Sequence, residues 1–237
     1  MSDSPPLNLV LVHGAWHDDT TWERVVDAWN EPHVTLSAIR LPSVDGGGDL
    51  QRDAEALVEF CRGLAGPITV LGHSYGGAVM TQASARIDGL RALIYLAAMK
   101  PALGESVSST ARTALDANDL DQAIAVRDGQ LLLDFDRARS ALYDEEDSDD
   151  VAKLALSVHP QAVATFTQRL TSDTPSSVPT TYLVCSRDRA ITPQLQRSMA
   201  RSCAEVIEMS SGHSPHVNQP GQLIEMLEDA IRRHAPY

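Results

Sequence analysis

One six-residue segment places a serine where its hydroxyl group could act as a nucleophile. The segment Gly72–Gly77 (GHSYGG) follows the apolar run Ile68–Leu71 and precedes a stretch with helix-compatible composition. A strand, a sharp turn and a helix in this order form a nucleophile elbow, where a strained turn exposes the serine and tolerates only small neighbours. Gly72 and Gly76 meet that need, and the N-terminus of the following helix favours an anion beside Ser74. We therefore predict that Ser74 is a nucleophile.

A carboxylate that could support this serine lies near the other end of the chain. Serine is a weak nucleophile that needs a base, and the base needs an orienting acid. Asp188 comes just after the apolar run Thr180–Cys185, at the strand end where ligands collect in open parallel sheets. An ordinary surface turn would also explain an aspartate between Arg187 and Arg189. We predict that Asp188 is the orienting acid.

Eight histidines are present, and two of them lie near a suitable sheet edge. His213 follows Gly212, which lets the loop bend over the site, whereas His216 follows Pro215 and is expected to begin the last helix. We therefore prefer His213 as the base. His73 ends a strand and should point away from Ser74. No HExxH-type pair suggests zinc, so we expect structural or surface roles for the remaining histidines that we weighed, His17, His33, His159 and His234.

Apolar runs alternate with helix-compatible segments along most of the chain, which predicts an α/β fold with a parallel sheet covered on both faces. The predicted strands are Leu7–Val12, Val34–Ile39, Ile68–Leu71, Leu90–Ala97, Thr180–Cys185 and Glu205–Met209. The predicted helices are one from Thr20, then Asp49–Cys61, Tyr75–Ile87, Gln194–Arg201 and Val217–Arg233.

The alternation stops between residues 100 and 178, a stretch far longer than an ordinary strand-to-helix loop. We predict a folded, helical lid over these residues, with helical patches at Leu115–Val126 and Val151–Leu170, and an α/β core made of residues 1–99 and 179–237. An acidic run between Asp144 and Asp150 lacks the spacing of a calcium loop, so we interpret it as solvated surface rather than a metal site.

Composition limits the class of partner. The 237 residues include 32 acidic and 19 basic side chains, and the net charge of −13 repels nucleic acid and anionic lipid. Three widely spaced cysteines imply no disulfide framework. The first residues, Met1–Asn8, do not read as a secretory signal, and no apolar stretch is long enough to cross a membrane. We expect a cytoplasmic protein with a small-molecule partner and no nucleic-acid or membrane partner; its oligomeric state stays open, with a homodimer as one option.

Taken together, these segments resemble the α/β-hydrolase superfamily over nearly the whole chain. The order Ser74, Asp188, His213 is the superfamily's order. The segment Val10–Trp16 (VLVHGAW), the GHSYGG elbow and the segment 212–216 (GHSPH) are similar to the branch that contains plant methylesterases, hydroxynitrile lyases and small bacterial esterases. The resemblance implies an α/β-hydrolase fold with a mostly parallel sheet of about six strands, helices on both faces and a helical lid insertion.

The resemblance also implies an oxyanion hole formed by the backbone N–H groups of Ala15 and Tyr75. In the similar hydroxynitrile lyases a threonine stands at the position of Gly14 and a lysine at that of Ser214, so the cation for leaving cyanide is missing here. Dehalogenases and epoxide hydrolases carry an aspartate at the elbow, which Ser74 disfavours.

The expected function is hydrolysis of a small, largely apolar carboxylic ester through an acyl-enzyme intermediate, with no metal and no organic cofactor. We expect Trp16, Met99 and Leu103 to line the acyl pocket, although core packing would explain each of them as well. Lactone, thioester or carbon–carbon bond hydrolysis, hydroxynitrile lysis, cofactor-free oxygenation and a non-catalytic ligand receptor remain alternatives, because fold does not fix function.

Overall fold

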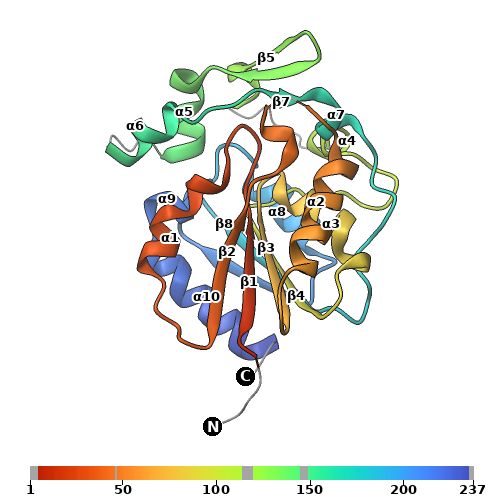
Figure 1. Cartoon of the computed structure of the whole chain (residues 1–237). Helices are drawn as coiled ribbons and strands as arrows, with labels where there is room; N and C mark the ends of the chain where they lie inside the picture. Colours follow the sequence, from red (N-terminus) through yellow and green to blue (C-terminus); the bar gives the residue numbers. More distant parts are fainter. Residues whose placement is uncertain (1–4, 46, 114–119, 145–148, 235–237) are drawn as a thin grey trace.

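A computed structural model describes residues 5–45, 47–113, 120–144 and 149–234. A central sheet is flanked by helices on both faces, and a smaller layer of helices and short strands covers one end of it (Figure 1). The N- and C-terminal ends of the chain lie at the opposite end of the molecule from this layer. The prediction of an α/β-hydrolase fold is confirmed.

All six strands of the main sheet run parallel, in the order β2-β1-β3-β4-β8-β9. The inner strands β1, β3 and β8 are buried along their whole length, as their apolar composition predicts for parallel strands covered on both faces, whereas the edge strands β2 and β9 are partly exposed. Each strand predicted from the sequence is present within two residues of its expected bounds. The strands are β1 Leu7–Val12, β2 Val34–Ile39, β3 Ile68–His73, β4 Leu90–Leu96, β8 Thr180–Cys185 and β9 Glu205–Met209.

Side chains of β1 alternate between two hydrophobic layers. Leu9 and Leu11 pack in a layer with residues of α1 and α10, whereas Val10 and Val12 pack with residues of α2, α3 and α8. A period of two is what a strand buried on both faces requires. The core helices and single turns are η1 Asp19–Trp22, α1 Glu23–Ala28, η2 Pro42–Asp45, α2 Leu50–Arg62, α3 Gly76–Ala83, η3 Ser84–Arg86, α8 Pro193–Ala200, α9 Pro215–Asn218 and α10 Pro220–His234.

The last predicted helix, Val217–Arg233, is divided in two. Helix α9 ends at Asn218, and α10 begins at Pro220. Proline lacks the N–H that a helix interior needs and fits the first position of a new helix, which explains the break.

The insertion between β4 and β8 forms a cap, which is more mixed than the helical lid we predicted. It contains a three-stranded antiparallel sheet in the order β5-β6-β7 that we did not foresee. Of the predicted helical patch Leu115–Val126, residues 115–119 lie outside the described part, and Ile124 begins strand β5. The patch Val151–Leu170 is split into two short helices around β7. The elements of the cap are α4 Val107–Ala111, η4 Asp121–Ala123, β5 Ile124–Arg127, β6 Gln130–Leu133, α5 Phe135–Tyr143, α6 Asp149–Ala155, β7 Gln161–Ala162 and α7 Val163–Thr167.

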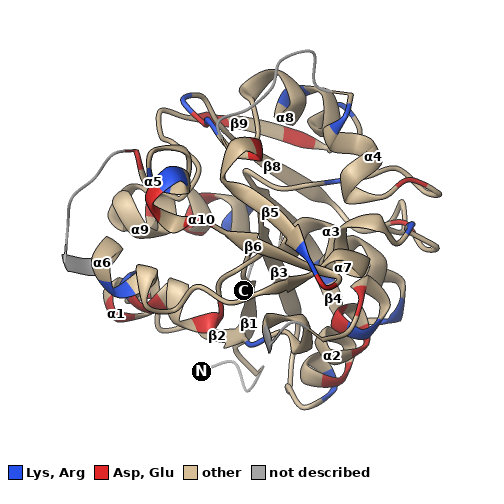
Figure 2. Cartoon of the chain, turned by 90° about the horizontal axis from the view of Figure 1, so that it is seen from above, with Lys and Arg blue, Asp and Glu red and all other residues tan. Residues whose placement is uncertain are grey.

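Seen from above, strands β5 and β6 of the cap lie across the main sheet, and both acidic and basic residues are scattered over the surrounding helices and loops (Figure 2). The cap therefore covers the edge at which the loops after β1, β3, β8 and β9 emerge (Figure 1). Within the described residues, no helix combines the length and the apolar character that crossing a bilayer demands.

Candidate active site

Ser74 lies between β3 and α3 in a left-handed backbone conformation, with φ 52°. A residue with a side chain seldom adopts this conformation unless its surroundings enforce it. Three backbone hydrogen bonds do so here: Ser74 N–H donates to Leu96 O (3.2 Å), and Ser74 O accepts from the N–H groups of Gly77 (3.2 Å) and Met99 (2.9 Å). The elbow is thereby tied to the loop that follows the neighbouring strand β4.

The glycines of the elbow are required by close backbone contacts. A Cβ atom on Gly72 would lie 2.7 Å from the carbonyl group of Gly76, and one on Gly76 would lie 2.6 Å from Val12 O. Real Cβ atoms do not approach backbone this closely, so a side chain at either position would force the turn open. The tight turn leaves Ser74 partly accessible between buried neighbours.

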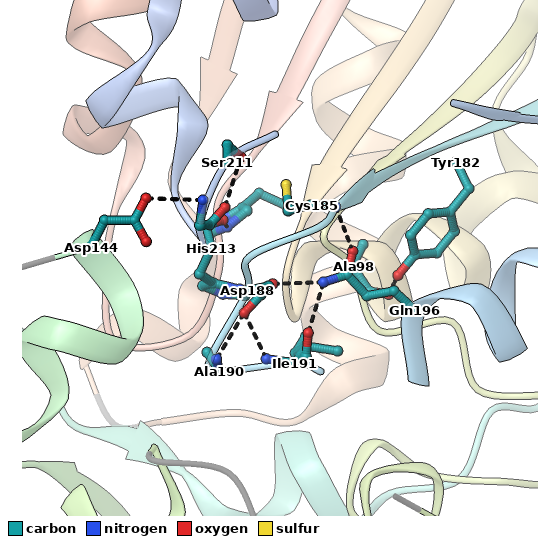
Figure 3. Close-up of polar contacts among 12 residues, drawn as sticks. Ala98, Asp144, Tyr182, Cys185, Asp188, Ala190, Ile191, Gln196, Ser211 and His213 are labelled. Carbon is teal, nitrogen blue, oxygen red and sulfur yellow. Dashed lines mark hydrogen bonds and ion pairs between the residues drawn. The ribbon is translucent and has the colours of Figure 1, made fainter. Parts of the chain in front are cut away.

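Asp188 and His213 form the contact that the sequence predicts. His213 Nδ1–H donates to Asp188 Oδ2 at 2.7 Å, and both side chains are buried (Figure 3). The other oxygen, Asp188 Oδ1, accepts from the backbone N–H groups of Ala190 (2.7 Å) and Ile191 (2.9 Å). This arrangement fixes His213 as the Nδ1–H tautomer, so its Nε2 atom can accept a proton.

Gln196, which sequence reasoning missed, also holds this carboxylate. Its Nε2–H₂ group donates to Asp188 Oδ2 at 2.7 Å, and its Oε1 atom accepts from Cys185 N–H at 2.9 Å (Figure 3). Gln196 lies in the predicted helix that follows the aspartate loop, and its side chain is fully buried. The sequence did offer one signal for Gln196: it is a polar residue at a core-facing position of an amphipathic helix.

The structure separates the two candidate histidines. Only His213 contacts Asp188; His216 Nε2 instead hydrogen-bonds Thr21 Oγ1 at 3.1 Å, and its ring packs on Trp22 at 4.6 Å between centroids. The preference for His213 agrees with this geometry.

His73 lies closer to the site than we expected from its place in the strand. Its ring packs against those of His213 (4.7 Å) and His216 (4.4 Å), and its Nε2–H donates to His213 O at 2.9 Å. It therefore helps to fix the backbone of the His213 loop. Burial, with the charges of the two neighbouring histidines, holds the pKa of His73 well below its usual range.

The loop after β1 reaches the site from the other side of the elbow. His13 fixes this loop, because its Nδ1–H donates to Gly14 O (2.8 Å) and its Nε2 accepts from Leu41 N–H (3.0 Å). Ala15 and Tyr75 are both buried. Among the described residues, no hydrogen-bond acceptor is found for the backbone N–H of either Ala15 or Tyr75. Buried N–H groups without partners are rare and are suited to bind an oxyanion.

Ser74 and His213 line one small cavity under the cap. Its volume is about 10 Å³, which is room for about one water molecule. An ester larger than this can enter only if the cap moves, as lids of many enzymes do. The cavity is lined by Gly14, Ala15, Trp16, His17, Thr21, His73, Ser74, Leu142, Tyr143, His213, Ser214 and His216.

Of the three residues expected to line the acyl pocket, only Trp16 lines the cavity. Trp16 lines the cavity, and its indole N–H donates to Leu131 O of the cap at 3.0 Å. Met99 is buried beneath the elbow but is not part of the cavity wall. Leu103 does not line it either: it lies in a turn, and its side chain is 60% exposed.

Two consecutive cap residues touch the loops of the site. Tyr143 hydrogen-bonds His17 in the loop after β1, and Asp144 Oδ2 accepts from Gly212 N–H at 2.9 Å beside His213 (Figure 3). The cap is thus attached to the core on both sides of the cavity. Over the part of the chain that the structure describes, no lysine or arginine lines this cavity, and no group of three metal-ligating side chains gathers.

Comparison with known proteins agrees with this arrangement. Residues 9–226 match the family model described as the alpha/beta hydrolase family. The chain belongs to that family. This hydrolase is 25% identical over 244 residues to an alpha/beta hydrolase of Aspergillus novofumigatus, covering 94% of this chain and 95% of the fungal protein.

Solved structures share its fold at low sequence identity. A pyrethroid hydrolase from Sphingobium faniae has a TM-score of 0.81 at 21% identity, and the match covers 98% of this hydrolase and 100% of that chain. A methylesterase from Arabidopsis has a TM-score of 0.78 at 18% identity, with 96% and 99% of the two chains covered.

Proposed function

We propose that this hydrolase cleaves a small, largely apolar carboxylic ester through an acyl-enzyme intermediate. The observation that carries the proposal is the buried pair of His213 and Asp188, joined at 2.7 Å, in which His213 lines the same cavity as the strained serine of the elbow. The names of the methylesterase and the pyrethroid hydrolase support hydrolytic chemistry on this fold.

In the proposed reaction, His213 Nε2 takes the proton of Ser74 as its oxygen attacks the ester carbonyl. Asp188 holds the imidazole in place and stabilises its cation, while the N–H groups of Ala15 and Tyr75 bind the oxyanion. The imidazolium then protonates the leaving alcohol, and the acyl group stays on Ser74. Water repeats these steps against the acyl-enzyme and releases the acid. Each step of this mechanism uses only these side chains, the two backbone N–H groups and water.

The cavity wall favours hydrolysis over hydroxynitrile lysis. Gly14 and Ser214 both line the cavity, and no lysine or arginine joins them among the described lining residues. A departing cyanide anion would find no cationic partner there. Hydrolysis needs none, because its leaving alcohol receives a proton from the imidazolium.

The test combines a fluorophosphonate probe with short-chain p-nitrophenyl esters. We expect the wild type to be labelled and to turn over esters, and Ser74→Ala or His213→Ala to lower turnover by about three or more powers of ten, because members of a triad act as one unit. His216→Ala serves as the matched histidine variant and should lose far less. Tight ligand binding without labelling or turnover would instead indicate a receptor, and a greater loss in His216→Ala than in His213→Ala would contradict the assigned base.

A further inference from the structure

The cavity contains a second polar pair that the proposed mechanism does not use. His17 from the loop after β1 and Tyr143 from the end of α5 both line the cavity beside Ser74 and His213. Both side chains are buried, and their rings meet edge to face at 5.9 Å between centroids. The two residues are 126 positions apart in the sequence, so only the closed cap brings them together.

The hydrogen bonds of this pair have a fixed direction. His17 Nδ1 lies 3.0 Å from Ala15 O, a carbonyl that can only accept, so this nitrogen carries the proton. Burial lowers the pKa of His17 to about 4, and a neutral ring with Nδ1–H leaves Nε2 as an acceptor. The Tyr143 hydroxyl, 2.5 Å from that Nε2, must therefore be the donor. Burial also raises the pKa of Tyr143, which keeps the phenol protonated.

It follows that Tyr143 can present only an acceptor to the cavity. Its single proton is directed at His17, and within the described residues no other donor reaches its oxygen. A buried oxygen that finds no donor loses the hydrogen bonds that water would give it. A substrate without a donor would leave this oxygen unpaired when it displaces water, whereas a substrate hydroxyl would satisfy it.

We propose that Tyr143 is a specificity residue that accepts a hydrogen bond from a hydroxyl group of the substrate, close to the scissile carbonyl. The substrate class is then a hydroxy ester, with the hydroxyl on the acyl or the alcohol part. The hydroxyl must be close because Tyr143 and Ser74 share a cavity of only about 10 Å³. This inference rests on the proposed ester hydrolysis and narrows it. Sites built to bind a substrate hydroxyl discriminate strongly against analogues that lack it.

The experiment compares kcat/KM for ethyl butanoate with that for ethyl 2-hydroxybutanoate, ethyl 3-hydroxybutanoate and 2-hydroxyethyl butanoate. We expect the wild type to prefer at least one hydroxylated ester by about tenfold or more. Tyr143→Phe should reduce this preference to about one, with most of the loss in the KM for the hydroxylated ester. Tyr95→Phe is the matched control, because the hydroxyl of Tyr95 is hydrogen-bonded to Thr81 and Thr174 away from the cavity. It should keep the full preference.

A wild type without any preference, or a Tyr143→Phe variant that retains it, overturns the inference. If Tyr143→Phe does not fold, calorimetry on Ser74→Ala provides a second test. It compares the affinity for the hydroxylated products 2-hydroxybutanoate, 3-hydroxybutanoate and ethylene glycol with the affinity for butanoate and ethanol. Tighter binding of a hydroxylated product supports the inference, and equal binding overturns it. Failure of the proposed function looks different, because the wild type would then neither react with a fluorophosphonate nor hydrolyse any of the four esters.

Discussion

At the scale of single residues, the carboxylate of Asp188 is the most heavily supported group in the site. It accepts hydrogen bonds from two backbone N–H groups, from His213 and from Gln196. Several hydrogen bonds to both oxygens fix the orientation of a buried carboxylate. Gln196 is the one side-chain donor besides the imidazole among the described residues, and it ties the carboxylate to β8 through Cys185 N–H.

Replacing Gln196 tests this support. Gln196→Leu removes one donor from Asp188, so the imidazole is less firmly oriented, and we expect kcat to fall about tenfold or more with little change in KM. Gln82→Leu is a matched control, since Gln82 is also buried and is hydrogen-bonded to Thr171 but does not line the cavity. Steady-state kinetics and thermal unfolding of both variants give the answer. Equal losses of kcat in the two variants would indicate that Gln196 has only a structural role.

At the scale of elements, the cap and the His213 loop meet through a close contact between Asp144 and Gly212. Asp144, just after α5, adopts a left-handed conformation with φ 56° and receives the N–H of Gly212. A Cβ atom on Gly212 would lie 1.7 Å from Asp144 Oδ1, so a larger residue there would displace the Asp144 carboxylate from its present position. The same glycine was predicted from the sequence only to let the loop bend over the site.

We therefore expect the loss of activity caused by Gly212→Ala to be relieved by a second substitution in the cap. The alanine methyl group collides with the Asp144 carboxylate, so the single variant should lose about tenfold or more in kcat/KM. Asp144→Gly removes the carboxylate and still tolerates the left-handed conformation. The double variant should recover to the level of Asp144→Gly alone, as measured in a double-mutant cycle on kcat/KM. Simple additivity of the two losses would show that the contact does not form in solution.

At the scale of the whole molecule, buried titratable groups make the folded state sensitive to pH. Burial lowers the pKa of both His13 and His17 to about 4 and holds the pKa values of His73 and His216 well below their usual range. Asp53 behaves in the opposite sense: burial raises its pKa to about 6, although Tyr75 OH donates to its Oδ2 at 2.8 Å. Folding therefore disfavours protonation of these four histidines and favours protonation of Asp53 at pH values below about 6.

The free energy of unfolding, measured at several pH values, tests the direction of the histidine contribution and of the Asp53 contribution. The unfolded histidines take up protons near pH 6.5, so stability is lost as the pH falls from 7 toward 4, by about 2 kcal/mol at pH 5 for each of His13 and His17. The contribution of Asp53 is fully present below pH 3.8 and is lost as the pH rises through about 6. Asp53→Asn abolishes that contribution. From pH 7 to pH 5, urea unfolding should therefore show the wild type gaining about 1 kcal/mol relative to Asp53→Asn. A difference in unfolding free energy that stays constant between pH 7 and pH 5 would contradict the raised pKa of Asp53.

The sequence alone determined the features that arise within short segments. A mainly apolar run such as Leu7–Val12 is buried on both faces in the middle of the sheet, and the glycines around Ser74 permit a turn that bulkier residues block. Strand, elbow and the order of the three candidate triad residues were therefore readable in advance. So was Asp188, because parallel strands bring their carboxyl ends to one edge.

Only the tertiary structure decided which side chains meet across long stretches of chain. It placed His213 rather than His216 against Asp188, exposed Leu103, and brought Tyr143 of the cap to His17. Contacts of this kind depend on how loops and cap pack, and packing is set by many side chains at once rather than by any local period. The mixed cap escaped prediction for the same reason, since its strands are too short to show a pattern of their own.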